Sequence, residues 1–423
     1  MALSKFNDWR VVLVTSLISA TLLAACGGGG ADSATGAATQ AATGGATAAT
    51  VADTYSQGPI SGFGSIVVGG VRYDDSTATV SDEDGVSANR SALKLGMTVQ
   101  VDAGVVTRSP ASSSAADATA KASRIRFGSE LVGPVAGVNS AAGTLVVLGQ
   151  TITVTSATVF DDTLVGGLAA VTTGSVIEVH GIRDTVTGTT VATRIEPKAS
   201  ATSYRLRGTV SALDSTAKTF KIGSQTINYA SAASVPTTLA NDQIVRVVLN
   251  TAQLSGAWVA TALNNGTRLP TGTVREAHLE GLITAFTSST AFTVNGLLVD
   301  ASSATFPDGT TGIVLGARVE VTGSVANGKL VATQVEIEER RDAGKRVMEL
   351  HGDITSIDTT AKTFVLRGVT VWYGGNVTYK NGSEGALAVG KTVDVRGVLA
   401  SDRTQFEARS IEIKATTASS TTG

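Results

Sequence analysis

Apolar and polar residues alternate in short runs along most of this chain, and the runs recur in the same order. In residues 315–324 (LGARVEVTGS), Val319 and Val321 alternate with polar neighbours, which is the period-two pattern of a strand with one buried face. Residues 323–328 read as a turn, and residues 330–336 (LVATQVE) alternate again as a returning strand. Relatives of this stretch occur five times, so the chain is predicted to be a β-repeat protein.

Each repeat opens with apolar residues around a glycine, at intervals of 71 to 75 residues. The openings are Gly58-Pro-Ile60, Gly133-Pro-Val135, Gly208-Thr-Val210, Gly281-Leu-Ile283 and Gly352-Asp-Ile354. This period exceeds the 20 to 50 residues of solenoid repeats, which predicts small domains arranged as independent beads.

A strand, a glycine turn and a second strand follow each opening, and this pattern is typical of a hairpin whose turn needs positive φ. The hairpins span residues 66–73, 145–152, 220–227, 292–299 and 364–371. Fourth strands are predicted at Val99-Gln-Val101, Ile177-Glu-Val179, Val245-Arg-Val247, Val319-Glu-Val321 and Val393-Asp-Val395. Fifth strands are predicted at 122–125, 192–195, 260–263, 332–335 and 408–411.

Five strands in about 70 residues favour an all-β fold of five tandem small five-stranded barrels of the oligonucleotide-binding (OB) type, because closure removes exposed edges. A short-stranded sandwich is the competing architecture. The apolar residue that precedes the fourth strand is followed three positions later by glycine, except in the third unit, where Asp242 replaces it. That substitution puts the geometry of the third turn in question.

These elements, Gly-x-Ile/Val, strand-glycine-strand, Leu-x-x-Gly-x-x-Val-x-Val-x-Gly and Ala-Thr-x-Ile/Val-Glu, resemble the bacterial family catalogued as domain of unknown function 5666. The resemblance covers residues 58 to 414 and is weakest in the third unit. It implies an exported protein and brings no established reaction or catalytic residue.

The N-terminal residues predict where the protein is located in the cell. Lys5 and Arg10 precede an apolar run over residues 11–25, which is too short for a comfortable membrane span, and Leu23-Ala24-Ala25-Cys26 resembles a bacterial lipobox. Cys26 is the only cysteine, so no intrachain disulfide is possible and acylation gives this thiol a role. We expect a lipoprotein anchored in the cell envelope at Cys26. Gly27 follows where an Asp would favour inner-membrane retention, which favours the outer membrane; an ordinary secretory signal is the alternative.

The predicted organisation follows from these patterns. Residues 26–57 are nearly all Gly, Ala, Ser and Thr and are expected to form a flexible tether. The full division is a signal peptide at 1–25, the tether at 26–57, barrels at 58–128, 129–198, 203–266, 277–339 and 347–415, and a disordered tail at 416–423. Exposed junctions are expected near Glu130 and at 198–204, 268–277 and 338–347.

Charge argues against nucleic acid as a partner, because 33 basic residues balance 35 acidic ones and no basic run follows the signal segment. Arg124 with Arg126 and Arg205 with Arg207 are the pairs that a single-stranded nucleic-acid face would use. Besides the membrane, an envelope protein and an envelope polysaccharide are the partners considered.

Residues that might carry chemistry are few. His180, His278 and His351 have no spacing typical of a metal site or catalytic triad and are interpreted as ordinary strand positions. Two acidic stretches, 82–85 and 161–162, could hold calcium but also suit turns. The aromatic residues considered for sugar stacking, and expected instead in barrel cores, are Trp258, Trp372, Tyr373 and Tyr379.

No catalytic residue, metal ligand or cofactor is therefore predicted, and the ligand is unknown. The leading hypothesis is a non-catalytic binding or spacer module. The alternatives are a single-stranded nucleic-acid-binding protein and an envelope hydrolase, for which Asp161 and Glu178 would be the acid and base.

Overall fold

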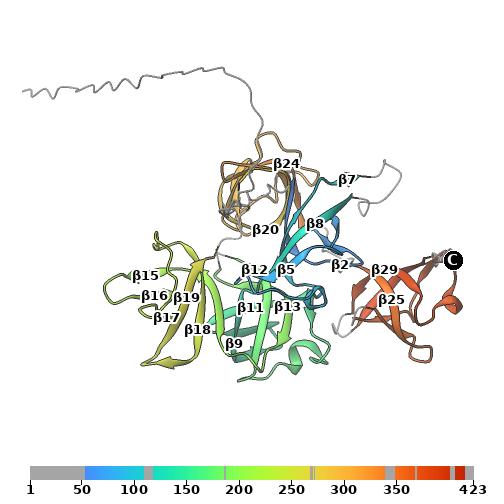
Figure 1. Cartoon of the computed structure of the whole chain (residues 1–423), viewed down its shortest axis with the longest axis horizontal. Helices are drawn as coiled ribbons and strands as arrows, with labels where there is room; N and C mark the ends of the chain where they lie inside the picture. Colours follow the sequence, from blue (N-terminus) through green and yellow to red (C-terminus); the bar gives the residue numbers. More distant parts are fainter. Residues whose placement is uncertain are drawn as a thin grey trace, which may run out of the picture. The chain divides into compact units, whose positions relative to one another are not determined.

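The computed structural model describes residues 53–108, 118–184, 187–266, 270, 272–338, 348–366, 369–400 and 405–414. These residues are built almost wholly of strands, and the chain segments wrap into small barrels (Figure 1). Three short 3-10 helices lie in connections: η1 (Arg90–Ala92), η3 (Gly167–Ala170) and η4 (Glu384–Ala386). No helix in the described part of the chain is long and apolar enough to cross a membrane.

The strands fall into five sets, which we call the first to fifth units. The first contains β1 (Thr54–Pro59), β2 (Gly62–Phe63), β3 (Ile66–Val68), β4 (Val71–Asp74), β5 (Thr79–Asp82), β6 (Thr98–Ala103), β7 (Thr107–Arg108) and β8 (Ala118–Phe127). The second contains β9 (Leu131–Asn139), β10 (Thr144–Val147), β11 (Gln150–Phe160), β12 (Val176–Arg183) and β13 (Thr190–Pro197). The third contains β14 (Tyr204–Thr209), β15 (Ser211–Asp214), β16 (Thr219–Ile222), β17 (Gln225–Asn228), β18 (Ile244–Leu254) and β19 (Ala257–Asn265).

The fourth unit contains β20 (Val274–Ser288), β21 (Ala291–Val294), β22 (Leu297–Asp300), β23 (Arg318–Ala326) and β24 (Lys329–Ile337). The fifth contains β25 (Met348–Asp358), β26 (Thr363–Leu366), β27 (Val369–Trp372), β28 (Thr378–Lys380), β29 (Thr392–Leu399) and β30 (Phe406–Ile413). Because β1 begins at Thr54 and pairs with β6, residues 54–57, which the sequence pattern assigns to the tether, lie in the first unit.

Strand pairing closes these sets into barrels. In the fourth unit β20 pairs with β21, β21 with β22, β22 in parallel with β24, β24 with β23, and β23 with β20 again. The second and fifth units repeat this circuit. In the first and third units the opening strand is interrupted, as β1 with β2 and as β14 with β15. The prediction of an all-β fold with small closed five-stranded barrels is confirmed, and the sandwich alternative is wrong.

A β-bulge explains the glycine that ends the fourth-strand motif. The register between strands four and five shifts at Gly181, Gly323 and Gly397. A Cβ atom at Gly323 would lie 2.1 Å from the carbonyl oxygen of Val331 on the neighbouring strand. Only glycine allows this approach, so the motif records a close backbone contact at the bulge.

The turn before each fourth strand has the same geometry in all units. Gly96, Gly174, Gly316 and Gly390 have φ between 81° and 87°, and their N–H groups donate to the opening strand's carbonyl groups. Asp242 adopts φ 67° and donates to Val210 O at 2.9 Å in the same way. The third turn therefore has the same shape as the others, because Asp tolerates the left-handed region.

The units are not independent beads, because their opening strands pair with one another. Residues 131–134 of β9 pair with β12 along one edge. Strand β10 pairs with the other edge of β9 only from Val135 onward, so that edge is open to another strand before Val135. That free edge pairs with β14 of the third unit, where Leu131 lies opposite Leu206. Strand β1 likewise pairs in parallel with β20, and β2 with β25. An edge strand has unpaired backbone N–H and C=O groups, and here strands of other units pair with them.

The cores follow this pairing. One cluster of buried side chains runs through the second and third units, and a second runs through the first and fifth. The junction expected to be exposed near Glu130 is buried, since Glu130 is 3% exposed. Residues 199 and 200 are exposed, as expected for a connection between the second and third units.

Candidate functional site

Each unit carries a row of three outward-facing residues across its first, fourth and fifth strands, beginning at the residue before the opening glycine. We call these the polar rows. They are Gln57–Gln100–Arg126, Val132–Glu178–Glu196, Arg207–Arg246–Asn264, Glu280–Glu320–Glu336 and His351–Asp394–Glu412. Strand alternation sends these residues away from each barrel core, so the rows face neighbouring units or solvent.

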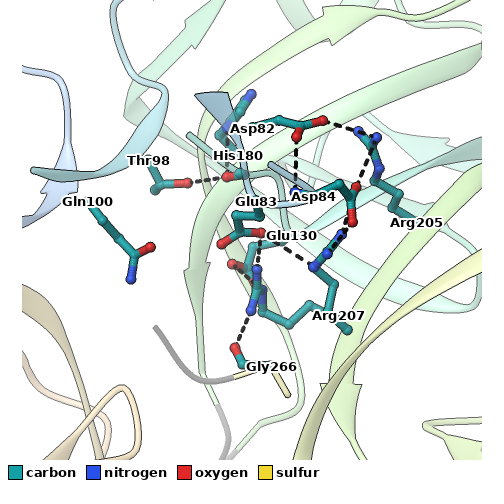
Figure 2. A network of polar contacts seen from close by, with 12 residues as sticks. Asp82, Glu83, Asp84, Thr98, Gln100, Glu130, His180, Arg205, Arg207 and Gly266 are labelled. Atoms are coloured by element: carbon teal, nitrogen blue, oxygen red, sulfur yellow. Dashed lines mark hydrogen bonds and ion pairs between the residues drawn. The ribbon is translucent and has the colours of Figure 1, made fainter. Parts of the chain in front are cut away.

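The third unit's row is covered by the acidic loop of the first unit, residues 82–84 (Figure 2). Glu83 pairs with Arg207, and Asp84 pairs with Arg246. Arg205 Nη2 lies 3.2 Å from Asp84 Oδ2 and 3.5 Å from Asp82 Oδ2. Three arginines of one unit therefore neutralise three carboxylates of another.

This contact changes the interpretation of two features in the sequence. Residues 82–84 were candidate calcium ligands, and Arg205 with Arg207 were a candidate nucleic-acid face. Burial would raise the pKa of Asp84, but Arg246 and Arg205 outweigh it and lower the pKa, which keeps the carboxylate charged. The two features are paired with each other in the folded chain.

Gly128 lies at the centre of this junction. Its carbonyl oxygen accepts from Thr98 Oγ1 at 2.7 Å and from His180 Nδ1 at 3.0 Å. A Cβ atom at Gly128 would lie 2.1 Å from the Glu83 carboxyl carbon, so the acidic loop packs directly on this glycine. A residue in the connection between β8 and β9 thus joins the acidic loop to the second unit.

A second polar cluster lies on the second unit's row, where Glu178 and His180 are buried on β12 and Glu196 is on β13. One potential ligand atom from each of these three residues lies within 4.8 Å of the others. Among the described residues, this is the only group of three His, Cys, Asp or Glu side chains with such spacing. The sequence pattern predicts an ordinary strand position for His180 and gives no signal at Glu196.

Cations surround the carboxylates of this cluster. Lys198 Nζ lies 2.5 Å from Glu178 Oε2 and 3.5 Å from Glu196 Oε1. Arg194 contacts Glu196 and Asp161, each at 2.8 Å. Burial lowers the pKa of Lys198, but the two glutamates outweigh it and raise the pKa.

The proposed acid and base of a hydrolase, Asp161 and Glu178, are linked through this chain of ion pairs. Asp161 binds Arg194, and Glu178 binds Lys198. Burial would raise the pKa of Glu178, but the ion pair with Lys198 opposes this, and the pKa is lowered. Burial would also raise the pKa of Asp161, but hydrogen bonds from Thr163 and the charge of Arg194 outweigh it and lower the pKa, and a carboxylate held in its charged form is poorly suited to act as the general acid.

The other two histidines also contact carboxylates. His278 Nε2 lies 2.9 Å from Glu276 Oε1, and its Nδ1 lies 3.4 Å from Thr322 Oγ1. His351 Nδ1 contacts Asp394, whose other oxygen lies 2.6 Å from Lys414 Nζ. In the sequence, the contact of His180 and His278 with a carboxylate is indicated by an acidic residue two positions earlier, because residues i and i+2 lie on the same face of a strand.

The remaining sequence candidates have structural roles or lie elsewhere. Trp258 and Tyr373 are buried in barrel cores, as expected, and Trp258 Nε1 donates to Gln225 at 2.9 Å. Trp372 and Tyr379 are partly buried. Burial and Asp161 raise the pKa of Asp162, and Asp161 is paired with Arg194. Cys26, the predicted lipidation site, lies outside the described residues.

A small cavity of about 50 Å³ lies where four units meet. Its lining includes Gln57, Glu130, Arg183, Arg207 and Glu280. That volume suits ordered water rather than an organic ligand.

Comparison with known proteins agrees with this repeated geometry. The family model described as domain of unknown function (DUF5666) matches residues 132–196, 280–336 and 351–412, which lie in the second, fourth and fifth units. These three segments are similar to this family. No curated protein matches it. A solved structure described as drosophila Unr CSD456 is 13% identical, covers 50% of this chain and 97% of its own, and superposes with a TM-score of 0.14. The three matched segments share a barrel circuit and a bulge glycine, and the family's description assigns no activity.

Proposed function

We propose that this protein is a non-catalytic module of the bacterial cell envelope, held to a membrane by lipid on Cys26, whose barrels form a spacer or binding platform. One observation carries the proposal: the charged side chains best suited to ligand binding are paired with one another between units. Glu83 with Arg207 and Asp84 with Arg246 join the first and third units. Charges used in this way stabilise an arrangement of barrels.

The pairing of opening strands supports the same function. Backbone hydrogen bonds join β1 to β20, β2 to β25 and β9 to β14, and such contacts resist bending more than flexible linkers do. A spacer needs this stiffness. An outer-membrane location is part of the proposal and rests on the residues that follow the lipobox.

The anchor is tested by detergent-phase partitioning of the wild type and Cys26→Ser. We expect the wild type in the detergent phase and the variant in the aqueous phase, with globomycin causing the uncleaved wild-type precursor to accumulate. Equal partitioning of both forms would contradict the anchor.

The platform is tested separately by small-angle scattering of the Cys26→Ser chain. We expect the scattering profile of a folded body with fixed barrel positions, and a broader distribution of distances in Arg207→Gln/Arg246→Gln. A wild-type profile typical of beads on flexible linkers would contradict the spacer. Cross-linking in envelope extract, followed by identification of the captured protein or polysaccharide, would then name the partner.

A further inference from the structure

His180 presents a nitrogen that has no partner in a buried position. The side chain is 0% exposed, and its Nδ1 faces the carbonyl oxygen of Gly128 at 3.0 Å. A carbonyl oxygen only accepts, so Nδ1 carries the proton in this contact. With the proton on Nδ1, Nε2 is the ring nitrogen that bears the lone pair in the neutral imidazole.

That lone pair faces another acceptor. His180 Nε2 makes no hydrogen bond and lies 3.9 Å from Glu178 Oε1. Glu196 contributes an oxygen to the same space, with all three ligand atoms within 4.8 Å of one another. Lys198 offsets the repulsion between the two carboxylates, but His180 Nε2 stays buried without a hydrogen-bond partner, and a metal ion among the three atoms would bind all of them.

We propose that Glu178, His180 and Glu196 form a binding site for a divalent transition-metal ion that accepts mixed nitrogen and oxygen ligands, of which Zn²⁺ is the test case. Three protein ligands with a fourth position left open match the donor number of open zinc sites. Tetrahedral bonds of about 2.0–2.1 Å place ligands about 3.3 Å apart, so only small side-chain movements are needed. The hydrogen bond from Nδ1 to a backbone carbonyl is the usual contact that orients a metal-binding histidine.

Lys198 occupies the carboxylates when the metal is absent. Its amine lies 2.5 Å from Glu178 and 3.5 Å from Glu196, and its side chain is 42% exposed. The flexible amine can therefore turn to solvent when a dication neutralises both glutamates. The lysine acts as a competing cation, so its removal strengthens metal binding.

The fifth unit provides a matched comparison. Its polar row contains a histidine and two acids, His351, Asp394 and Glu412, whereas His180 of the second unit lies two residues after the row residue Glu178. Lys414 corresponds to Lys198. There the imidazole Nδ1 contacts Asp394 directly, and the three ligand atoms do not converge as they do in the second unit. Glu412→Gln is therefore the control for Glu196→Gln.

The experiment is calorimetric titration of Zn²⁺ into the full chain carrying Cys26→Ser, which removes a thiol that would itself bind zinc. We expect one ion per chain, at least tenfold weaker binding in Glu196→Gln and His180→Gln, about tenfold tighter binding in Lys198→Met, and unchanged binding in Glu412→Gln. Circular dichroism checks the fold of each variant, and Glu196→Gln decides the question if His180→Gln fails to fold.

Three outcomes overturn the site: no binding by the parent chain, unchanged affinity in Glu196→Gln, or weaker affinity in Lys198→Met. Loss of affinity in Glu412→Gln equal to that in Glu196→Gln would also overturn it, because it would indicate nonspecific binding to acidic rows.

Discussion

Glu83 and Arg207 lie 124 residues apart in the sequence and form an ion pair between the first and third units. Only 6% of the Arg207 side chain and 13% of the Glu83 side chain are exposed. Arg207 also donates to the carbonyl oxygen of Gly266 and lies 3.4 Å from Glu130. One guanidinium thus joins the acidic loop, the second unit and the end of β19.

Replacement of Arg207 should therefore cost more than loss of a surface pair. Removal of one partner from a buried ion pair costs about 3–5 kcal/mol, because the other charge stays buried. We expect Arg207→Gln to lower the urea midpoint strongly and Glu83→Gln/Arg207→Gln to recover part of the loss. Arg124→Gln, which breaks a half-exposed pair with Asp102, should cost at most about 1 kcal/mol. Equal effects of Arg207→Gln and Arg124→Gln would contradict the buried network.

The barrels could be predicted from the sequence because their determinants are local. Alternation at Val319 and Val321 marks a strand, and the Asn295-Gly296 pair marks a hairpin turn with positive φ at both residues. The same pattern recurs along the chain, so the interpretation of one unit also applies to the others. The structure was needed only to explain the glycines at the bulge and those in the turn before each fourth strand.

The relation between units could not be predicted, because it depends on contacts far apart in sequence. Nothing local to residues 82–84 indicates that three arginines more than 100 residues away cover them. The sequence analysis therefore considered the acids for calcium and the arginines for nucleic acid. The polar row of the second unit was missed for a related reason, since Glu178 and Glu196 become neighbours only through the register of β12 and β13.

The third unit's turn offers a stabilising substitution. Asp242 adopts φ 67°, where the other four units have glycine. Left-handed backbone costs an L-residue about 1–2 kcal/mol, and less for Asp. We expect Asp242→Gly to raise stability by about 0.5–1 kcal/mol and Gly174→Asp to lower it by a similar amount. Thermal unfolding of both variants measures this, and a lower midpoint for Asp242→Gly would show that the Asp side chain contributes more than the strain costs.

The bulge of the fourth unit should not accept a side chain. A Cβ atom at Gly323 would lie 2.1 Å from Val331 O, and a backbone atom cannot rotate away. We expect Gly323→Ala to cost about 1–3 kcal/mol, the usual range for overpacking. Gly137→Ala serves as the control, since no atom lies within 4 Å of the added carbon. Urea unfolding curves compare the two, and equal midpoints would rule out the bulge contact.

The contact between the first and fourth units should weaken in acid. A hydrogen bond from His278, followed by one from Arg108, outweighs burial and lowers the pKa of Glu276 to about 2. Its folded pKa lies below the unfolded value of about 4.3, so its stabilisation is complete above pH 4.3 and is lost as pH falls toward 2. We expect the stability difference between wild type and Glu276→Gln to shrink over that interval in acid titrations. A difference that stays constant down to pH 2 would contradict the ion pair.

Cleavage of the connection between the second and third units tests whether the barrels are joined beyond their linker. Residues 199 and 200 are exposed, so a specific protease site inserted there should be cut in the native protein. The cut leaves Leu131 opposite Leu206 in one sheet and within one buried cluster, and it leaves Glu83 paired with Arg207. We therefore expect the two fragments to co-elute in native gel filtration and to separate in urea. The nicked Arg207→Gln/Arg246→Gln variant should dissociate at lower urea concentration. Two separate peaks from nicked wild type in native buffer would mean that the units are beads after all.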